Sequence, residues 1–397
     1  MSDLLAAIAG VGADPRRGGY SRHGFDRADL ELRAWFVEEA ERRGLAVRTD
    51  RNGNVWAWWG TPGPDAVVTG SHLDSVPGGG AFDGPLGVVS ALAAVDALQA
   101  RGFTPSRPLA VVVFAEEEGG RFGVPCLGSR LLAGTIDPDA ARRLHDPDGV
   151  TLAEAVAEVG LDASRLGRDD VALGLIGTFV ELHVEQGRGL ADLDAPVAVA
   201  SSILAHGRWR FRFAGEGNHA GATPIGDRRD PMLPASALVL AARRAAAGVE
   251  GARATVGRLT PNPGGTNVIA STVDVWLDAR ADDTARTRAV VDEITAAAHD
   301  AAAAEGCALT VTEESYGGTV HFDAALRDRL AGSLGGVPVL ATGAGHDAGV
   351  LAARVPTAML FVRNPTGVSH APAEHAEPAD CAAGVEALAA VLAELAG

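Results

Sequence analysis

The chain has 397 residues, which is too long for one small hydrophobic core and predicts two domains. Its formal net charge of −17 argues against nucleic acid or an anionic membrane as a partner. All 34 basic residues are arginine, which excludes Schiff-base and pyridoxal-phosphate chemistry on a lysine and the lysine of a phosphate-binding P-loop.

The first half of the chain alternates short apolar runs with alanine-rich stretches. The runs at 66–69, 109–115 and 178–184 predict strands, and 88–100 predicts a helix. Because these runs show little alternation, we expect strands that are buried on both faces. This predicts an α/β fold in which helices cover a parallel or mixed sheet.

A glycine-rich loop, GSHLDSVPGGGAFDGPLG, follows the first of these strands and contains His72, Asp74 and Asp83. Open α/β sheets build their sites at the carboxyl ends of strands, so the loop is a candidate site. A carboxylate near a histidine also fixes the ring tautomer of a metal ligand. An alternative is a capped helix, with Asp83 as its N-cap and Pro85 in its first turn.

Three adjacent glutamates, Glu116, Glu117 and Glu118, follow the most apolar run of the chain, LAVVVFA. An isolated run of this kind is typical of a solvated loop. Beside a buried sheet, however, these carboxylates repel one another unless a cation compensates their charge. With His72 and Asp83 nearby, the glutamates favour a metal site.

A third histidine, His183, lies in the apolar segment ELHVEQG, with Glu181 and Glu185 on its own face of the strand. A buried histidine that is satisfied within the core is the alternative interpretation.

The pattern changes after Ile203. Residues 208–215 alternate strictly, and they are followed by a helix at 234–247, strands at 254–259 and 273–279, a helix at 284–305 and a strand at 308–313. The order β-α-β-β-α-β is the ferredoxin-like signature. We therefore predict an inserted domain over 206–318, with 1–205 and 319–397 forming the metal-binding catalytic domain.

The last motif, GVSHAPAE, places His370 in a loop after the apolar run TAMLFV. Its first residues, GVSHA, lack only the final glycine of the G-x-S-x-G nucleophile elbow of serine hydrolases. Pro372 also interrupts the helix that should follow, and both features argue against that class. Histidines and carboxylates without cysteine suit Zn²⁺, Mn²⁺ or Co²⁺. Three histidines with two carboxylates fit two ions that share one carboxylate.

The three cysteines form no C-x-x-C pair, and no basic segment precedes the apolar start of the chain. These features predict a cytoplasmic protein in a reducing compartment. No apolar run approaches the ~20 residues that a membrane span needs.

The motifs GSHLDSVPGGGAFDGPLG, EEGGRF, ELHVEQG, GNHAGATP, TNVI, DAR, GAGHDAG and GVSHAPAE occur in this order. In that order the chain resembles the N-carbamoyl-L-amino acid hydrolases, a group that includes allantoate amidohydrolases and β-ureidopropionases. The group is related to metal-dependent aminoacylases and carboxypeptidases. The resemblance implies a dinuclear metal-dependent amidohydrolase that forms a dimer through the inserted domain.

The resemblance also implies a role for each matching residue. One ion would bind His72, Asp83 and His183, and the other Asp83, Glu118 and His370, with Glu117 as general base and Asp74 as the supporting carboxylate. The substrate would contact His219 of a neighbouring subunit, Arg280, Asn267 and Gln186. From the residues alone, a surface pair of Arg280 with Asp278 and a turn at Asn267 are the favoured interpretations.

The activity implied is hydrolysis of the ureido group of a small anionic substrate, an N-carbamoyl-L-amino acid or allantoate, with release of ammonia and carbon dioxide. An aminoacylase or dipeptidase with the same metals is the nearer alternative. A metal-dependent binding protein without catalysis is the other, although it has no use for a base at Glu117.

Overall fold

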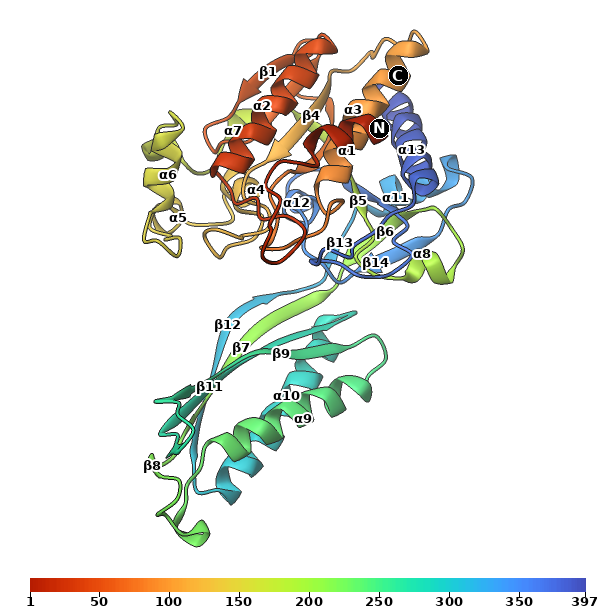
Figure 1. Ribbon diagram of the computed structural model, residues 1–397. Helices are drawn as coiled ribbons and strands as arrows, with labels where there is room; N and C mark the ends of the chain where they lie inside the picture. The colour runs from red at the N-terminus through yellow and green to blue at the C-terminus, as the bar shows by residue number, and fades with distance from the viewer. The chain divides into compact units, whose positions relative to one another are not determined.

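The computed structural model describes all residues from 1 to 397, which form two compact units (Figure 1). Unit 1 contains Met1–Ser202 and His321–Gly397, and unit 2 contains Ile203–Val320. Each unit has its own hydrophobic core, and each is described separately below.

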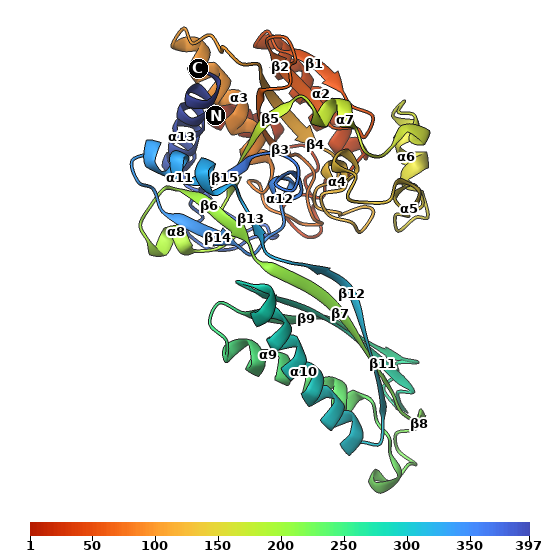
Figure 2. The same cartoon turned by 180° about the vertical axis from the view of Figure 1, so that it is seen from behind.

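Unit 1 is built on a nine-stranded mixed sheet (Figure 2). Its strands are β1 (Ala46–Thr49), β2 (Val55–Trp59), β3 (Ala66–His72), β4 (Leu109–Phe114), β5 (Ile176–Val184), β6 (Val197–Ile203), β13 (Val320–His321), β14 (Val339–Thr342) and β15 (Thr357–Val362). They lie in the order β1-β2-β4-β3-β5-β15-β6-β13, with β14 beside β6. Strand β3 runs parallel to β4 and β5, so the carboxyl ends of these three strands meet at one edge. The predicted α/β fold with a mixed sheet is confirmed.

Helices pack on both faces of this sheet. The helices of unit 1 are α1 (Ser2–Ile8), α2 (Arg27–Arg42), α3 (Pro85–Ala100), α4 (Leu127–Ala133), α5 (Pro138–Arg142), α6 (Leu152–Glu158), α7 (Asp170–Leu173), α8 (Gly189–Asp192), α11 (Ala324–Ser333), α12 (Asp347–Leu351) and α13 (Pro378–Ala396). Because side chains alternate along β5, Leu182 and Val184 join the core beneath α3 and α13, whereas Glu181 and His183 face α12.

Helix α3 directly follows the glycine-rich loop. Pro85 occupies its first turn, where the missing N–H of proline has no helical partner to lose. The following residues are mostly alanine, leucine and valine and are buried. This anchors the end of the loop against the core.

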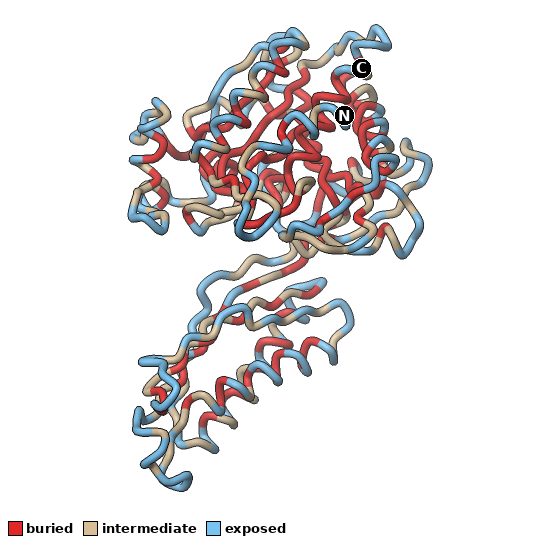
Figure 3. The backbone as a smooth tube through the Cα atoms, viewed as in Figure 1, coloured by how far each residue is buried: buried red, intermediate tan, exposed pale blue.

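Unit 2 is a four-stranded antiparallel sheet with two long helices. Its main elements are, in chain order, β7 (Ala205–Ala214), α9 (Met232–Ala247), β9 (Arg253–Asn262), β11 (Thr272–Ala281), α10 (Thr284–Ala304) and β12 (Ala308–Gly317). The strand order is β12-β7-β11-β9, and a small second sheet pairs β8 (Asn218–His219) with β10 (Val268–Ile269). Trp209, Phe211 and Phe213 alternate along β7 and are buried with residues of α9 and α10. Figure 3 shows buried stretches alternating with exposed ones along the chain.

No helix in the structure is both long enough and apolar enough to cross a membrane.

Candidate metal centre

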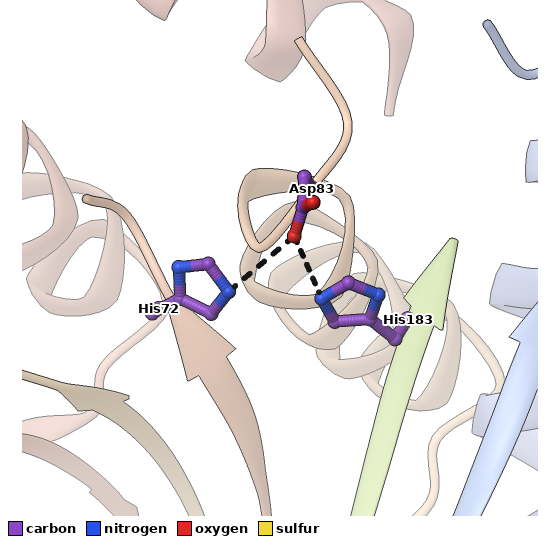
Figure 4. Close-up of side chains that lie close together, drawn as sticks. All are labelled: His72, Asp83 and His183. Atoms are coloured by element: carbon purple, nitrogen blue, oxygen red, sulfur yellow. Dashed lines mark ion pairs between the residues drawn. The ribbon is translucent and has the colours of Figure 1, made fainter. Parts of the chain in front are cut away.

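The candidate ligands of unit 1 come from the strand ends that meet at one edge of the sheet. His72 is the last residue of β3, Glu117 and Glu118 follow β4, and His183 lies near the end of β5. Asp83 lies in the loop just before α3, and both imidazole rings point toward its carboxylate (Figure 4). The parallel pairing of β3 with β4 and β5 therefore brings together residues that are far apart in the sequence.

The Asp83 carboxylate lies between two groups of side chains. Its Oδ1 atom is 3.7 Å from His72 Nε2 and 3.2 Å from His183 Nε2. Its Oδ2 atom is 3.4 Å from His370 Nε2, which is itself 3.5 Å from Glu118 Oε2. Gly84, and not Asp83, is the N-cap of α3, and no side chain caps this helix. The capped-helix interpretation of Asp83 is therefore wrong.

Hydrogen bonds to main-chain oxygens orient both buried imidazoles. His183 Nδ1 lies 2.9 Å from the carbonyl oxygen of Val184, and His72 Nδ1 lies 3.1 Å from that of Asp74. A carbonyl oxygen only accepts, so each Nδ1 carries a hydrogen and each Nε2 faces Asp83. Both Nε2 atoms are buried and have no hydrogen-bond partner. This is the arrangement in which the second ring nitrogen is available to a metal ion.

The separations within each group suit a divalent ion. In a tetrahedral site with bonds of about 2.0–2.1 Å, neighbouring ligand atoms are ~3.3 Å apart. His72, Asp83 and His183 form one group whose ligand atoms approach closely enough, and Asp83, Glu118 and His370 form the second. Nitrogen and carboxylate donors without thiolate are a set that Zn²⁺, Mn²⁺ and Co²⁺ accept.

The three consecutive glutamates have different surroundings. Glu116 has a left-handed backbone and accepts hydrogen bonds from the amides of Gly24, Arg121 and Phe122. It therefore stabilises loops and does not face the histidines. Glu117 Oε2 lies 3.6 Å from His72 Nε2, and Glu118 belongs to the group with His370.

Asp74 supports the same edge mainly through its carboxylate. Its two oxygens accept the amides of Glu117 at 3.1 Å and Glu118 at 3.0 Å. Its Oδ1 atom is 3.6 Å from His72 Nδ1, which is farther than the main-chain oxygen of Asp74 itself. Asp74 thus orients the His72 ring through its backbone and the glutamates through its side chain.

Several buried carboxyl groups meet at this edge. Burial, with the charges of neighbouring carboxylates, raises the pKa of Glu117 and Glu118 well above the usual range. Burial also lowers the pKa of His72 to about 4. Although burial opposes the shift, the nearby carboxylate of Asp83 raises the pKa of His183 to about 9. A divalent ion bound here would displace these protons, so the donor set fits a metal.

Gly84 explains one of the glycines in the loop. Its φ is +84°, and a Cβ atom at this position would lie 2.4 Å from Nδ1 of the His72 ring. Any other residue would push the ring and the chain apart. Glycine at this position lets the loop return close enough to place Asp83 beside His72.

Gln186, which follows β5, lies at the second group. Its Nε2 donates to Asp83 Oδ2 at 2.8 Å and to Ser369 Oγ at 3.1 Å. Ser369 Oγ in turn donates to Asp83 Oδ2 at 3.3 Å. The oxygen of Asp83 that faces His370 is thus well supplied with donors.

The other predicted substrate residues belong to unit 2. His219 is exposed in β8, and its Nδ1 accepts the amides of Gly221 and Ala222, so the neutral ring carries its proton on Nε2. Asn267 lies in a turn, and its carbonyl oxygen accepts the amide of Ala220. Asn267 therefore directly precedes β10, whose first residue, Val268, pairs with His219 in the small two-stranded sheet.

Arg280 is the third predicted substrate residue of unit 2. It forms a two-pronged pair with Asp278, Nε to Oδ1 at 2.7 Å and Nη2 to Oδ2 at 3.0 Å. The surface pair that the sequence allowed is therefore present.

Four further residues at the edge were not singled out from the sequence. His346 is buried with its ring centroid 4.5 Å from that of His183, and it lies in GAGHDAG, the motif that had no role. Cys126 Sγ donates to Glu117 Oε1 at 3.1 Å, and Asp347 belongs to the same cluster. Glu374, the last residue of GVSHAPAE, accepts the amides of Phe82 and Asp83. For His346, Asp347 and Glu374 the only sequence signal was their position in a motif, and Cys126 had none.

Comparisons with known proteins identify the family of the chain. A profile of Peptidase family M20/M25/M40 matches residues 68–394. The chain is 39% identical to the N-carbamoyl-L-amino acid amidohydrolase of Geobacillus stearothermophilus, over 97% of this chain and 95% of that protein. It is 32% identical to the allantoate amidohydrolase of Escherichia coli, over 100% of this chain and 97% of that protein. The solved structure of an amidase of the hydantoinase/carbamoylase family from Burkholderia vietnamiensis matches with a TM-score of 0.87 and 32% identity, over 100% of this chain and 96% of that one.

Proposed function

Because the chain belongs to Peptidase family M20/M25/M40, we propose that it is a metal-dependent amidohydrolase that cleaves the ureido C–N bond of an N-carbamoyl-L-amino acid or of allantoate. The products would be ammonia, carbon dioxide and an amino acid or ureido acid. One observation carries the proposal: the buried carboxylate of Asp83 faces two ligand groups at once, with Glu117 beside them.

We assign one divalent ion to His72, Asp83 and His183 and a second to Asp83, Glu118 and His370. The native metal is Zn²⁺, Mn²⁺ or Co²⁺ in this proposal. When bound, the two ions supply Lewis acidity that polarises the scissile carbonyl and lowers the pKa of water.

Glu117 acts as the general base in this mechanism. It takes a proton from the attacking water and returns it to the leaving nitrogen. Its carboxylate is buried beside both ligand groups, within reach of a water held there. Cys126 donates to the other oxygen of Glu117 and leaves Oε2 on the side of His72.

We further propose that Gln186, His219, Asn267 and Arg280 bind the substrate. The Nε2–H of His219 can donate to the carbonyl oxygen as negative charge develops on it. Arg280 has the planar fork that matches a carboxylate, and it would exchange Asp278 for the carboxylate of the substrate.

Residues 206–318 would serve as a ferredoxin-like lid and dimerisation domain. Leu233 and Leu240 are 53% and 61% exposed on α9 and lie two turns apart on one face of the helix. Such a face suits a homodimer in which His219 is supplied by the neighbouring subunit, and light scattering by the purified protein tests the dimer. A cytoplasmic location is also proposed, since all three cysteines are free.

The decisive experiment measures ammonia release by the purified enzyme after reconstitution with Zn²⁺, Mn²⁺ or Co²⁺. The substrates are a set of N-carbamoyl-L-amino acids, allantoate, and the matching N-acetyl amino acids. Ammonia from a ureido substrate supports the proposal, and the ratio of the two ureido rates identifies the preferred substrate. Release of free amino acid from the N-acetyl compounds alone would instead make the protein an aminoacylase. Metal binding without any turnover would make it a binding protein.

A further inference from the structure

We propose that Glu374 is a positioning residue that joins the Asp83 loop to the His370 segment and holds two of the three ligands of the second group, Asp83 and His370, in place before an ion binds. The inference rests on the metal function proposed above. It concerns how the site is assembled and not the reaction itself.

The first observation is a pair of hydrogen bonds between distant parts of the chain. Glu374 Oε1 accepts the amides of Phe82 and Asp83, both at 2.9 Å, across more than 290 residues of sequence. Glu374 is only 5% exposed. Hydrogen bonds to a buried carboxylate are roughly twice as strong as neutral ones, so this contact fixes the backbone that carries Asp83.

The second observation concerns the other end of the link. His370 and Glu374 lie in one short segment that is closed by a hydrogen bond from the Glu374 amide to the carbonyl of Ala371. The His370 side chain is half-exposed, and its recorded polar contacts are with Asp83, Glu118 and Gln186. Unlike His72 and His183, it has no main-chain partner for its other ring nitrogen. The position of His370 therefore depends on its segment, and Glu374 anchors that segment.

The loop is shaped to accept this carboxylate. A Cβ atom at Gly80 would lie 2.3 Å from Glu374 Oε1 and 2.4 Å from its Cδ. Glycine at this position gives the side chain room to reach the two amides. The contact thus depends on a residue from each of the two segments that it joins.

The charge of Glu374 is the third observation. A neutral acceptor would satisfy the same amides, yet the chain places a carboxyl group against the Asp83 amide, with no arginine paired to it and with Oε2 unpartnered. Burying one more negative charge beside Asp83 is unfavourable by itself. Beside a cation the same charge is favourable, so Glu374 should increase metal affinity by its charge as well as by its geometry.

The test compares four variants, Glu374→Ala, Glu374→Gln, Gly80→Ala and the matched control Glu377→Gln. Glu377 lies three residues further on, and its exposed carboxylate contacts His375. Two measurements are made. The first is hydrogen exchange at the Phe82 and Asp83 amides in metal-free protein. The second is the affinity for each of two equivalents of Co²⁺, followed by visible absorption and by metal analysis after dialysis.

Glu374→Ala should speed exchange at the two amides and weaken the second equivalent of Co²⁺ by ~10–100-fold, the range typical of residues that support metal ligands. Gly80→Ala should reproduce both effects, since it displaces the same carboxylate from the opposite side. Glu374→Gln should also weaken Co²⁺ binding, by less, because it keeps an acceptor oxygen and loses the charge. The control should match the wild type.

Wild-type exchange and wild-type Co²⁺ affinity in both Glu374→Ala and Gly80→Ala would overturn the inference. If Glu374→Ala does not fold, Glu374→Gln and Gly80→Ala still test it. Failure of the proposed function has a different signature. A wild type that binds two Co²⁺ ions and releases no ammonia contradicts the function and leaves the role of Glu374 intact.

Discussion

In unit 1 the candidate ligands His72, Asp83 and His183 are at most 4% exposed, whereas His219 and Asn267 of unit 2 are exposed. The two regions are also held differently. Gln186 and Glu374 reach Asp83 from distant parts of the sequence, while His219 is oriented by amides two and three residues away. Buried like charges must be fixed by the whole fold, because each is costly unless it is paired. Residues that meet a small molecule must remain accessible, so local contacts suffice for them.

The largest expected effect is at the buried edge. Glu117→Gln should lower kcat by ~10³-fold, within the range for loss of a general base, because glutamine cannot take the proton. Both ions should remain bound, since Glu117 belongs to neither ligand group. The measurements are steady-state ammonia release and metal content by mass spectrometry. Near-normal kcat would remove Glu117 from the mechanism, and loss of one metal would make it a ligand instead.

Metal removal should have the next largest effect. It should reduce protection from hydrogen exchange at the metal site of unit 1 and leave unit 2 unaffected. Ions at 100 times their dissociation constants stabilise a protein by ~2.7 kcal/mol, and only the edge of unit 1 binds them in this proposal. Chelation should therefore speed hydrogen exchange in the segments 70–84, 115–118 and 181–186 and leave 205–317 unchanged. Adding Zn²⁺ or Mn²⁺ back should restore protection. Equal loss of protection in both units would contradict the separation.

The smallest expected effect is in unit 2. Arg280→Lys keeps the positive charge and loses the planar, two-pronged guanidinium. This should cost about 2 kcal/mol of binding free energy, so kcat/KM should fall ~30-fold, mainly through a higher KM. Metal content should not change. Arg212→Lys is the matched control, because Arg212 is exposed on the same sheet and forms no ion pair. An unchanged KM in Arg280→Lys would leave the pair with Asp278 as the whole role of Arg280.

Much of this contrast could be predicted from the sequence. Apolar runs predict buried strands, and charged residues directly after such a run are easily identified in the sequence. This identified the segments containing His72, Glu117 and His183, and the strict alternation at 208–215 indicated a different kind of sheet. The predicted mixed sheet is confirmed, while the metal assignments and the limits of the inserted domain stay predictions.

The sequence could not separate residues that look alike locally. Glu116 and Glu117 are neighbours, yet a left-handed backbone at Glu116 turns its carboxylate to the amides of Gly24 and Phe122. The role of Asp83 depends on which of its oxygens faces which histidine, a matter of a few ångströms. Glu374 meets its partners across more than 290 residues, so neither spacing nor periodicity reveals it.

The insertion of unit 2 also has a consequence for the order in which a nascent chain can fold. Unit 2 is one continuous stretch, but β15 pairs with both β5 and β6 and is made only after unit 2 is complete. Until then, β5 and β6 each lack a neighbour, and such edges favour aggregation. The group of His72, Asp83 and His183 is complete once residue 183 has been made, whereas the other group waits for residue 370. The ligands of the first group are therefore synthesised before those of the second group are complete.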